Sequence, residues 1–433
     1  MDTLQAGVSR VTITPPVGMY LIGMERTENS HGLRDDLYAT ALAFSDGAKE
    51  AIIVSCDLLK VHPDLVRRVR HDASARTSVP GENIMICATH CHSGPVTHAL
   101  PDSRPMYRAY VDNLAFLLVG LIQMAHDRMM PAHLGFGQGK AHIGINRRLT
   151  RPDGVTVIAA NPDGPVDPVV GVLRVDAADG RPIAVVVNYA CHPVVFGNGS
   201  NVISADWPGA MRRVVERVTG ATCLFVQGAA ADINPLPGEP CDREDVLERL
   251  GTEIGGEVIG IWAGVEPEPT DRVAVCGDRL TVPLLPPSQY EGRLPEFVEL
   301  DEFTRGLTWD ELQAQMREQS PWTAEVVGEG DDRRAVVELQ AIRAGETAIV
   351  SAAGEIFVET GMAVKRRSPI AHTMFAAYTN GSVGYFPLPE DYPRGGYEVS
   401  ESYVGYRLPA PVAPEAAGLI EEAAVRLLDE VSA

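Results

Sequence analysis

Basic residues are scarce in this sequence. Its 433 residues include 37 Lys and Arg against 58 Asp and Glu, so the formal net charge is −21 at pH 7. A protein that binds nucleic acid regardless of base sequence needs a basic face to neutralise phosphates, and the chain contains no run rich in Lys and Arg. We therefore expect no nucleic-acid partner, and we interpret the acidic surplus mainly as a source of solubility.

Features of secreted and membrane-spanning proteins are missing as well. The seven cysteines are odd in number and widely spread, which argues against a disulfide framework. Residues 1–5 lack a basic segment followed by an apolar stretch, and we find no run of about 18 apolar residues that would cross a bilayer. These absences predict a cytoplasmic protein without stable membrane association.

Three motifs of common enzyme classes are also absent. The chain has no Gly-x-Ser-x-Gly nucleophile elbow, no phosphate-binding Gly-x-x-x-x-Gly-Lys and no Gly-x-Gly-x-x-Gly. Serine-hydrolase, nucleotide-binding and dinucleotide-binding roles are therefore disfavoured.

The chain does contain the alternating pattern of an α/β protein. Short apolar runs bounded by turn residues predict buried strands, and stretches with helical spacing lie between them. The predicted strands are 51–56, 84–88, 183–189, 335–339 and 347–350, and the predicted helices are 107–124, 207–218 and 416–431. This pattern favours a mixed-sheet core flanked by helices, with strands covered on both faces. The 41 Gly and 32 Pro residues predict many shaped loops.

We expect one domain over residues 1–433, with an excursion from the main sheet at about 284–332. The composition changes near Leu284, where Pro-Pro and acidic residues begin. Within this excursion Thr308 and Glu311 have the spacing of a helix capping box, followed by an amphipathic stretch to Met316.

Two histidines follow the predicted strand at 84–88. In extended chain His90 and His92 would point the same way, and the Gly94-Pro95 turn would end the strand where a cleft forms. Imidazole is a frequent zinc ligand, so the pair indicates a metal site. The alternative is a pair of surface histidines.

Further polar residues follow other strands or lie in loops. His192 comes after the strand at 183–189 and Glu355 after the one at 347–350, and a small-residue turn leads to Asn234. Tyr385, Tyr392 and Tyr397 share a loop rich in Pro and Gly, and Arg147 lies in a separate segment. Each residue alone has a structural explanation, as a cap, a core histidine or a packing tyrosine.

Together these elements resemble the neutral/alkaline non-lysosomal ceramidase family, specifically its N-terminal catalytic domain. The matching segments occur in the family's order and cover nearly all of the chain. They are residues 6–15, 33–39, 88–95, 188–206, 228–235 and 354–355 and the tyrosine loop 385–397.

The resemblance implies a zinc hydrolase. It implies four zinc ligands, namely His90, His192, Glu355 and Tyr385. It also implies that His92, Arg147 and Tyr397 line the reacting carbonyl. Zinc would then activate a water and polarise the carbonyl, His92 would move protons, and Tyr397 or Arg147 would stabilise the oxyanion.

Two departures from the family shift the expected substrate away from ceramide. Asn234 stands where the family has a serine; an amide cannot act as a nucleophile, although it can donate a hydrogen bond to an oxyanion. We also expect the protein to lack the family's C-terminal β-sandwich domain.

The leading hypothesis is a zinc-dependent hydrolase that cleaves an amide (C–N) bond of a small or moderately polar substrate. The same residues also fit an esterase or lactonase, a true ceramidase, or a non-catalytic metal- or ligand-binding relative. The sequence does not determine the oligomeric state, and a homo-oligomer remains one of the alternatives.

Overall fold

The largest sheet has nine strands. The structure is a computed structural model that describes residues 4–97, 105–286 and 324–433. Within these ranges nine strands form a mixed sheet in the order β14-β12-β11-β8-β1-β4-β5-β6, with β16 paired to β8. These strands are β1 Gln5–Thr12, β4 Tyr38–Ser45, β5 Glu50–Cys56, β6 Ile84–Ala88, β8 Met130–Lys140, β11 Val169–Ala177, β12 Pro182–Tyr189, β14 Thr222–Gln227 and β16 Glu268–Pro269.

A second, five-stranded sheet belongs to the C-terminal part of the chain. Four of its strands follow the order β17-β19-β20-β22, and β18 pairs with β19. The strands are β17 Val273–Pro283, β18 Val326–Val327, β19 Arg334–Ala344, β20 Thr347–Ala352 and β22 His372–Ala376. The predicted excursion begins at the end of β17, and the helix predicted at 308–316 lies outside the described residues.

Parallel strand pairs explain where three of the helices lie. The pairs β5–β6, β12–β14 and β20–β22 are parallel, and a parallel pair needs a crossover connection that packs on the sheet. Helices α1, α3 and α7 lie in these connections. The helices are α1 Pro63–Thr77, α2 Pro105–Asp127, α3 Asp206–Thr219, α4 Glu244–Gly264, α7 Val358–Arg367, α8 Tyr397–Ser400 and α9 Ala416–Ser432.

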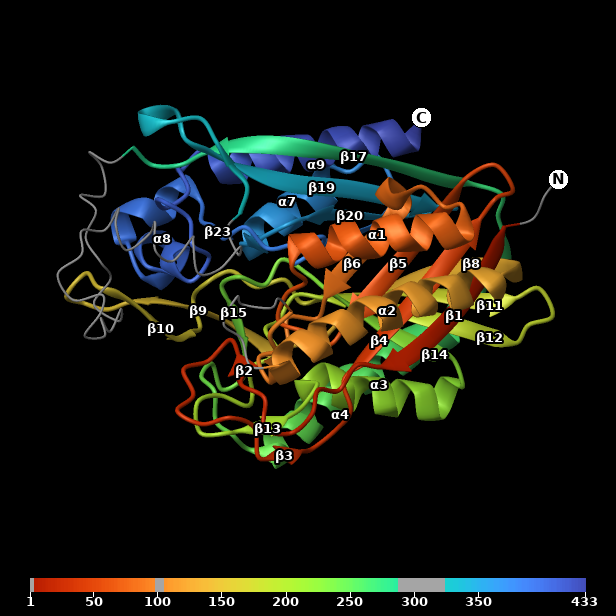
Figure 1. Cartoon of the computed structure of the whole chain (residues 1–433), viewed down its shortest axis with the longest axis horizontal. Coiled ribbons are helices and arrows are strands. Elements are labelled where there is room, and N and C mark those ends of the chain that lie inside the picture. Colours follow the sequence, from red (N-terminus) through yellow and green to blue (C-terminus); the bar gives the residue numbers. More distant parts are fainter. Residues whose placement is uncertain (1–3, 98–104, 287–323) are drawn as a thin grey trace.

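The core has two sheets between outer helices (Figure 1). Helices α1 to α4 cover the large sheet, while α9 packs on β17, β19 and β20. The inner faces share one apolar cluster, to which Phe44 and Met85 contribute from the large sheet and Ile342 and Met374 from the small one. The predicted mixed α/β fold is therefore confirmed, and the second face of many strands is covered by the other sheet.

The predicted elements correspond closely to observed ones. The strand segments 51–56, 84–88, 183–189, 335–339 and 347–350 fall within β5, β6, β12, β19 and β20. The helical segments 107–124, 207–218 and 416–431 fall within α2, α3 and α9.

Helix α2 is by length and composition apolar enough to cross a membrane. Arg108, Asp112 and Asn113 interrupt it, so it is not an unbroken run of apolar residues. The core helix of a soluble protein passes the same test of length and composition. Here α2 packs against α1, β1 and β4, and Leu114, Leu118 and Ile122 are among its buried residues.

Short sheets position the loops beside the core. A three-stranded sheet joins β9 Gly144–Thr150, β10 Thr156–Asn161 and β15 Ile233–Pro235. Two-stranded sheets join β2 Leu21–Ile22 to β7 Gly94–Pro95, β3 Gly32–Leu33 to β13 Val202–Ile203, and β21 Glu355–Ile356 to β23 Tyr385–Phe386. Gly94 and Pro95 therefore pair as a strand, which corrects the predicted turn.

Candidate metal centre

Three histidines converge beyond the carboxyl ends of β6 and β12. His90 and His92 follow β6, and His192 follows β12. One ligand nitrogen from each ring lies within 4.8 Å of the others. The structure corrects the expected reason for this convergence: His90 has a left-handed backbone with φ 66°, so the His90–His92 segment is not extended. Such a conformation is costly for a residue with a side chain and often marks a functional site.

Backbone carbonyls fix the orientation of all three rings. The Nδ1 atoms of His90 and His92 lie 2.8 Å from Leu59 O and 3.0 Å from Gly23 O, and His192 Nδ1 lies 2.6 Å from Ala230 O. Because a carbonyl only accepts, each Nδ1 carries the proton, and each Nε2 of a neutral ring presents a lone pair. His90 Nε2 and His192 Nε2 are 3.1 Å apart.

Burial keeps these imidazoles neutral. Desolvation lowers the pKa of His90 to about 3 and lowers the pKa values of His92 and His192 well below their ordinary range. Neutral imidazole is the form that binds metals. The arrangement therefore presents three metal-binding nitrogens at neutral pH.

One short parallel sheet brings Glu355 beside Tyr385. The register of β21 and β23 places these residues opposite each other. A side chain at Gly354 would meet the Phe386 ring at 2.3 Å, so the close approach of the two strands requires glycine. Glu355 Oε1 lies 3.3 Å from His90 Nε2. Burial raises the pKa of the Glu355 carboxyl to about 7.

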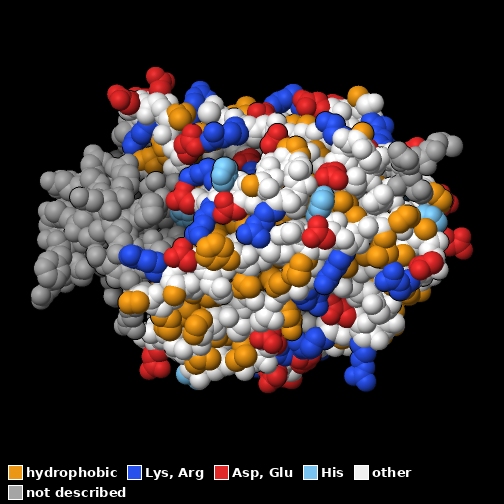
Figure 2. Space-filling model, turned by 45° about the vertical axis from the view of Figure 1, so that its right-hand side comes forward, with side chains coloured by type: hydrophobic (Ala, Val, Ile, Leu, Met, Phe, Trp, Pro, Cys, Tyr) orange, Lys and Arg blue, Asp and Glu red, His pale blue; other side chains and the backbone are white. Residues whose placement is uncertain are grey.

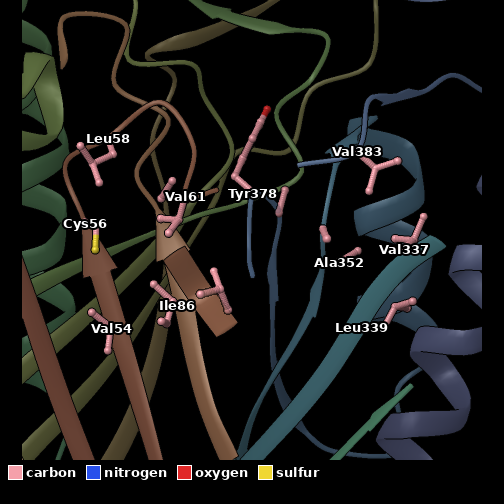
Figure 3. Packing of buried hydrophobic residues seen from close by; sticks show 14 of the residues in the cluster. Val54, Cys56, Leu58, Val61, Ile86, Val337, Leu339, Ala352, Tyr378 and Val383 are labelled. Carbon is pink, nitrogen blue, oxygen red and sulfur yellow. The ribbon is translucent and has the colours of Figure 1, made fainter. Parts of the chain in front are cut away.

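Two tyrosines that were not predicted from the sequence contact Glu355 and His90. Tyr406 donates a hydrogen bond to Glu355 Oε1. The Tyr378 ring stacks on His90 with centroids 3.9 Å apart. Figure 3 shows Tyr378 between the strand that carries Val54 and Cys56 and the strand that carries Val337 and Leu339. Tyr378 follows β22 at the same edge of the core. Its position after a strand was the one available signal in the sequence.

Arg147 lies in a hydrogen-bond network that includes Tyr385. Its Nη2 donates to Tyr385 Oη at 3.1 Å, its Nε donates to Glu398 at 2.9 Å, and one Nη1 proton points to Asn234 Oδ1 at 3.3 Å. Asn234 Nδ2 donates to Gly238 O at 2.9 Å. Both polar atoms of the Asn234 side chain therefore have partners in this arrangement, and its role at an oxyanion stays a prediction. Glu398, which also binds Arg148, was not identified from the sequence.

The site opens into a cavity of about 300 Å³. Tyr397, whose ring packs edge-on to Tyr385 with centroids 5.7 Å apart, lines this cavity together with His90, His92 and Glu355. Arg147 and His192 lie behind the cavity surface. The third loop tyrosine, Tyr392, donates to Val412 O at 2.7 Å and is a packing residue.

The side chains fit a bound metal ion. His92 Nε2 and Glu355 Oε2 are buried and have no hydrogen-bond partner among the described residues, a costly condition that a cation would relieve. The Nε2 atoms of His90 and His192 also lie 3.1 Å apart with no proton between them, and His192 Nε2 accepts a hydrogen bond from Arg147 Nη1 at 3.3 Å. Imidazole, carboxylate and phenol donors together suit zinc.

Comparison with known proteins gives a consistent result. The sequence profile described as neutral/alkaline non-lysosomal ceramidase, N-terminal, matches residues 4–234. The neutral ceramidase of Pseudomonas aeruginosa is 24% identical over 87% of this chain, and that of Mycobacterium tuberculosis is also 24% identical over 87%. The matches span 65% of the Pseudomonas protein and 70% of the Mycobacterium protein.

Two solved structures share the fold. A ceramidase complexed with C2 aligns with a TM-score of 0.76 and 20% identity, covering 100% of this chain and 76% of that chain. The crystal structure of neutral ceramidase from Pseudomonas aeruginosa aligns with a TM-score of 0.72 and 20% identity, covering 99% and 75% of the two chains.

Proposed function

The chain belongs to the neutral/alkaline non-lysosomal ceramidase family, and on that premise we propose that it is a zinc-dependent hydrolase of an amide (C–N) bond. The substrate is a small or moderately polar molecule that enters the cavity beside His90 and His92. The observation that carries this proposal is the set of three buried Nε2 lone pairs, each fixed by a backbone carbonyl.

His90, His192, Glu355 and Tyr385 would hold the zinc ion, and the unpartnered His92 Nε2 lies within reach of the same position. A bound zinc ion supplies a Lewis acid that polarises the amide carbonyl and lowers the pKa of a water. The buried surroundings strengthen such electrostatic effects because they exclude bulk water.

The chain's own residues would orient the substrate and move protons. His92 lines the cavity as the candidate base, and its Nδ1 donates to Gly23 O, which fixes the ring. A side chain at Gly23 would lie 2.7 Å from His92 Nδ1, so glycine is needed for this contact. Tyr397 offers a hydroxyl at the cavity surface to an oxyanion. Arg147 acts behind it as a positioning residue for Tyr385.

Metal content and amide hydrolysis test the proposal together. The purified protein should contain about one zinc ion per chain by elemental analysis, and chelation should abolish hydrolysis until zinc is restored. A matched panel of N-acyl amides, the corresponding esters, lactones and ceramide identifies the bond and the substrate class.

Two results would contradict the proposal. One is a protein that contains no metal and is indifferent to chelators. The other is a zinc-loaded protein that hydrolyses esters or lactones but no amide. Preferential hydrolysis of ceramide over the small amides would overturn the proposed substrate class. The proposal of a zinc-dependent amide hydrolysis would still stand.

A further inference from the structure

One wall of the cavity carries positive charge. Lys60 and Arg407 line it on the side of Tyr406, and the Lys60 Nζ lies 4.1 Å from the centre of the Tyr406 ring. Lys60 follows β5 and is only 9% exposed. A lysine is rarely buried to this extent, and here the side chain is directed along an aromatic face toward the cavity. We call Lys60 and Arg407 the cationic wall.

Arg407 is held in an unusual backbone conformation. Its φ of 54° is in the left-handed region, which is costly for a residue with a side chain. Its backbone N–H donates to Val404 O at 2.9 Å, which closes the turn that directs this residue to the cavity. Strain of this kind persists where the surrounding structure requires one side chain in one place.

The cationic wall is close to the candidate metal ligands. The face of the Tyr406 ring contacts Lys60, and the hydroxyl of the same ring donates to Glu355. One aromatic side chain therefore separates a buried cation from the carboxylate beside His90. A substrate whose amide lies at the metal centre would place a group a few bonds away against Lys60 and Arg407.

This charge contrasts with the rest of the chain. The net charge is −21, and acidic and basic side chains are interspersed over the face in Figure 2. Among the described residues that line the cavity, Glu355 is the one acidic side chain, and it is a candidate metal ligand. Positive side chains that line a cavity beside a candidate metal site repel a cationic substrate and attract an anionic one.

We propose that Lys60 and Arg407 form a carboxylate-binding subsite and that the substrate is an amide bearing a carboxylate a few bonds from the scissile carbonyl. The inference rests on the proposed function, because it names the substrate class of that same site. N-acyl amino acids carry the carboxylate on the amine side, and monoamides of dicarboxylic acids carry it on the acyl side. Both are anionic amides of small size.

Binding of uncleavable ligands tests the subsite without any reaction. The probes are the ketone isosteres of N-hexanoylglycine and N-hexanoylethanolamine, in which a methylene group replaces the amide nitrogen. These two molecules differ in a carboxylate against a hydroxyl. Calorimetry on the zinc-loaded protein should show the carboxylate isostere binding about 10- to 100-fold tighter, as expected for a charge-assisted contact.

Variants of Lys60 and Arg407 test whether these residues cause the preference for the carboxylate isostere. Lys60→Met keeps the length of the side chain and should remove most of the preference, whereas Lys60→Arg should retain it. Arg407→Gln keeps the residue's turn geometry and should reduce the preference independently. The control is Lys140→Met, because Lys140 is exposed at the end of β8, and this variant should bind both isosteres as the unaltered protein does. If Lys60→Met fails to fold, Arg407→Gln carries the same test.

Hydrolysis assays then distinguish amides that carry the carboxylate on the amine side from those that carry it on the acyl side. N-hexanoylglycine and N-hexylsuccinamate are compared with N-hexanoylethanolamine, and the preferred anionic amide identifies the side on which the carboxylate lies. Selective binding without hydrolysis of any amide would support the subsite and contradict the proposed function. Equal affinity of the unaltered protein for the two isosteres, or a preference that survives the Lys60→Met and Arg407→Gln substitutions combined, would overturn the subsite.

Discussion

The two walls of the cavity are built in different ways. His90, His92 and Glu355, which we call the metal wall, follow strands of the two sheets, and backbone carbonyls orient the two histidine rings. Lys60 and Arg407 of the cationic wall lie in loops after β5 and α8. Loops vary more readily than strand ends in a conserved scaffold. From this difference we propose that the metal wall supplies the reaction, whereas the cationic wall selects the substrate.

Removal of a metal ligand should have the largest effect and should not distinguish between substrates. His90→Ala removes one of three converging nitrogens, so we expect loss of bound zinc. Several kcal/mol of transition-state stabilisation would be lost with it, which corresponds to a decrease in kcat/KM of about 1,000-fold or more. Zinc content and kcat/KM for an anionic and a neutral amide measure this effect.

The matched control for that variant is His142→Ala. His142 is exposed just before β9, so its removal should change neither zinc content nor kcat/KM. If His90→Ala retained zinc and lost only the anionic substrate, the separation between the two walls would fail.

Tyr406 connects the two walls, and its hydroxyl should belong to the metal wall alone. Tyr406→Phe removes the hydrogen bond to Glu355 and keeps the ring beneath Lys60. Loss of a hydrogen bond that orients a metal ligand costs about 10- to 100-fold in metal affinity or activity. We expect both amides to lose activity equally, so that the ratio of their kcat/KM values is unchanged. A change in this ratio would show that the hydroxyl also acts on the cationic wall.

The sequence predicted the metal wall better than the cationic wall because strands leave a local signal. His90, His192 and Glu355 follow apolar runs, and the carboxyl ends of such strands meet at one edge. The left-handed turn at His90 had no such signal, and the predicted extended pair was therefore wrong in its backbone. The exact roles of the predicted ligands and of Tyr397 stay predictions.

Long-range contacts account for the residues that the sequence did not reveal. Lys60 and Tyr406 are far apart in the chain and meet only because β5 of the large sheet and the loop after α8 border the same cavity. The contact of the Asn234 side-chain oxygen with Arg147 depends in the same way on the pairing of β15 with β9, and a role of Asn234 at an oxyanion stays a prediction. Such contacts depend on the register between distant elements, which local patterns do not encode.

The smallest expected effect is a dependence of substrate preference on pH. Burial is the main cause that lowers the pKa of the Lys60 ammonium to about 7; the carboxylate of Glu355 opposes this decrease, and the positive charge of Arg407 contributes to it. A lysine with a lowered pKa is charged below that value and neutral above it, so attraction for a carboxylate weakens as the pH rises through 7. The ratio of kcat/KM for N-hexanoylglycine to that for N-hexanoylethanolamine should fall about two- to fivefold between about pH 6 and pH 8, because Arg407 stays charged. Titration of the metal centre affects the hydrolysis of both amides and cancels in this ratio.

Lys60→Arg should keep the ratio constant, since an arginine remains protonated throughout. A ratio that fell equally in both proteins would assign the pH dependence to another group and would separate Lys60 from substrate selection.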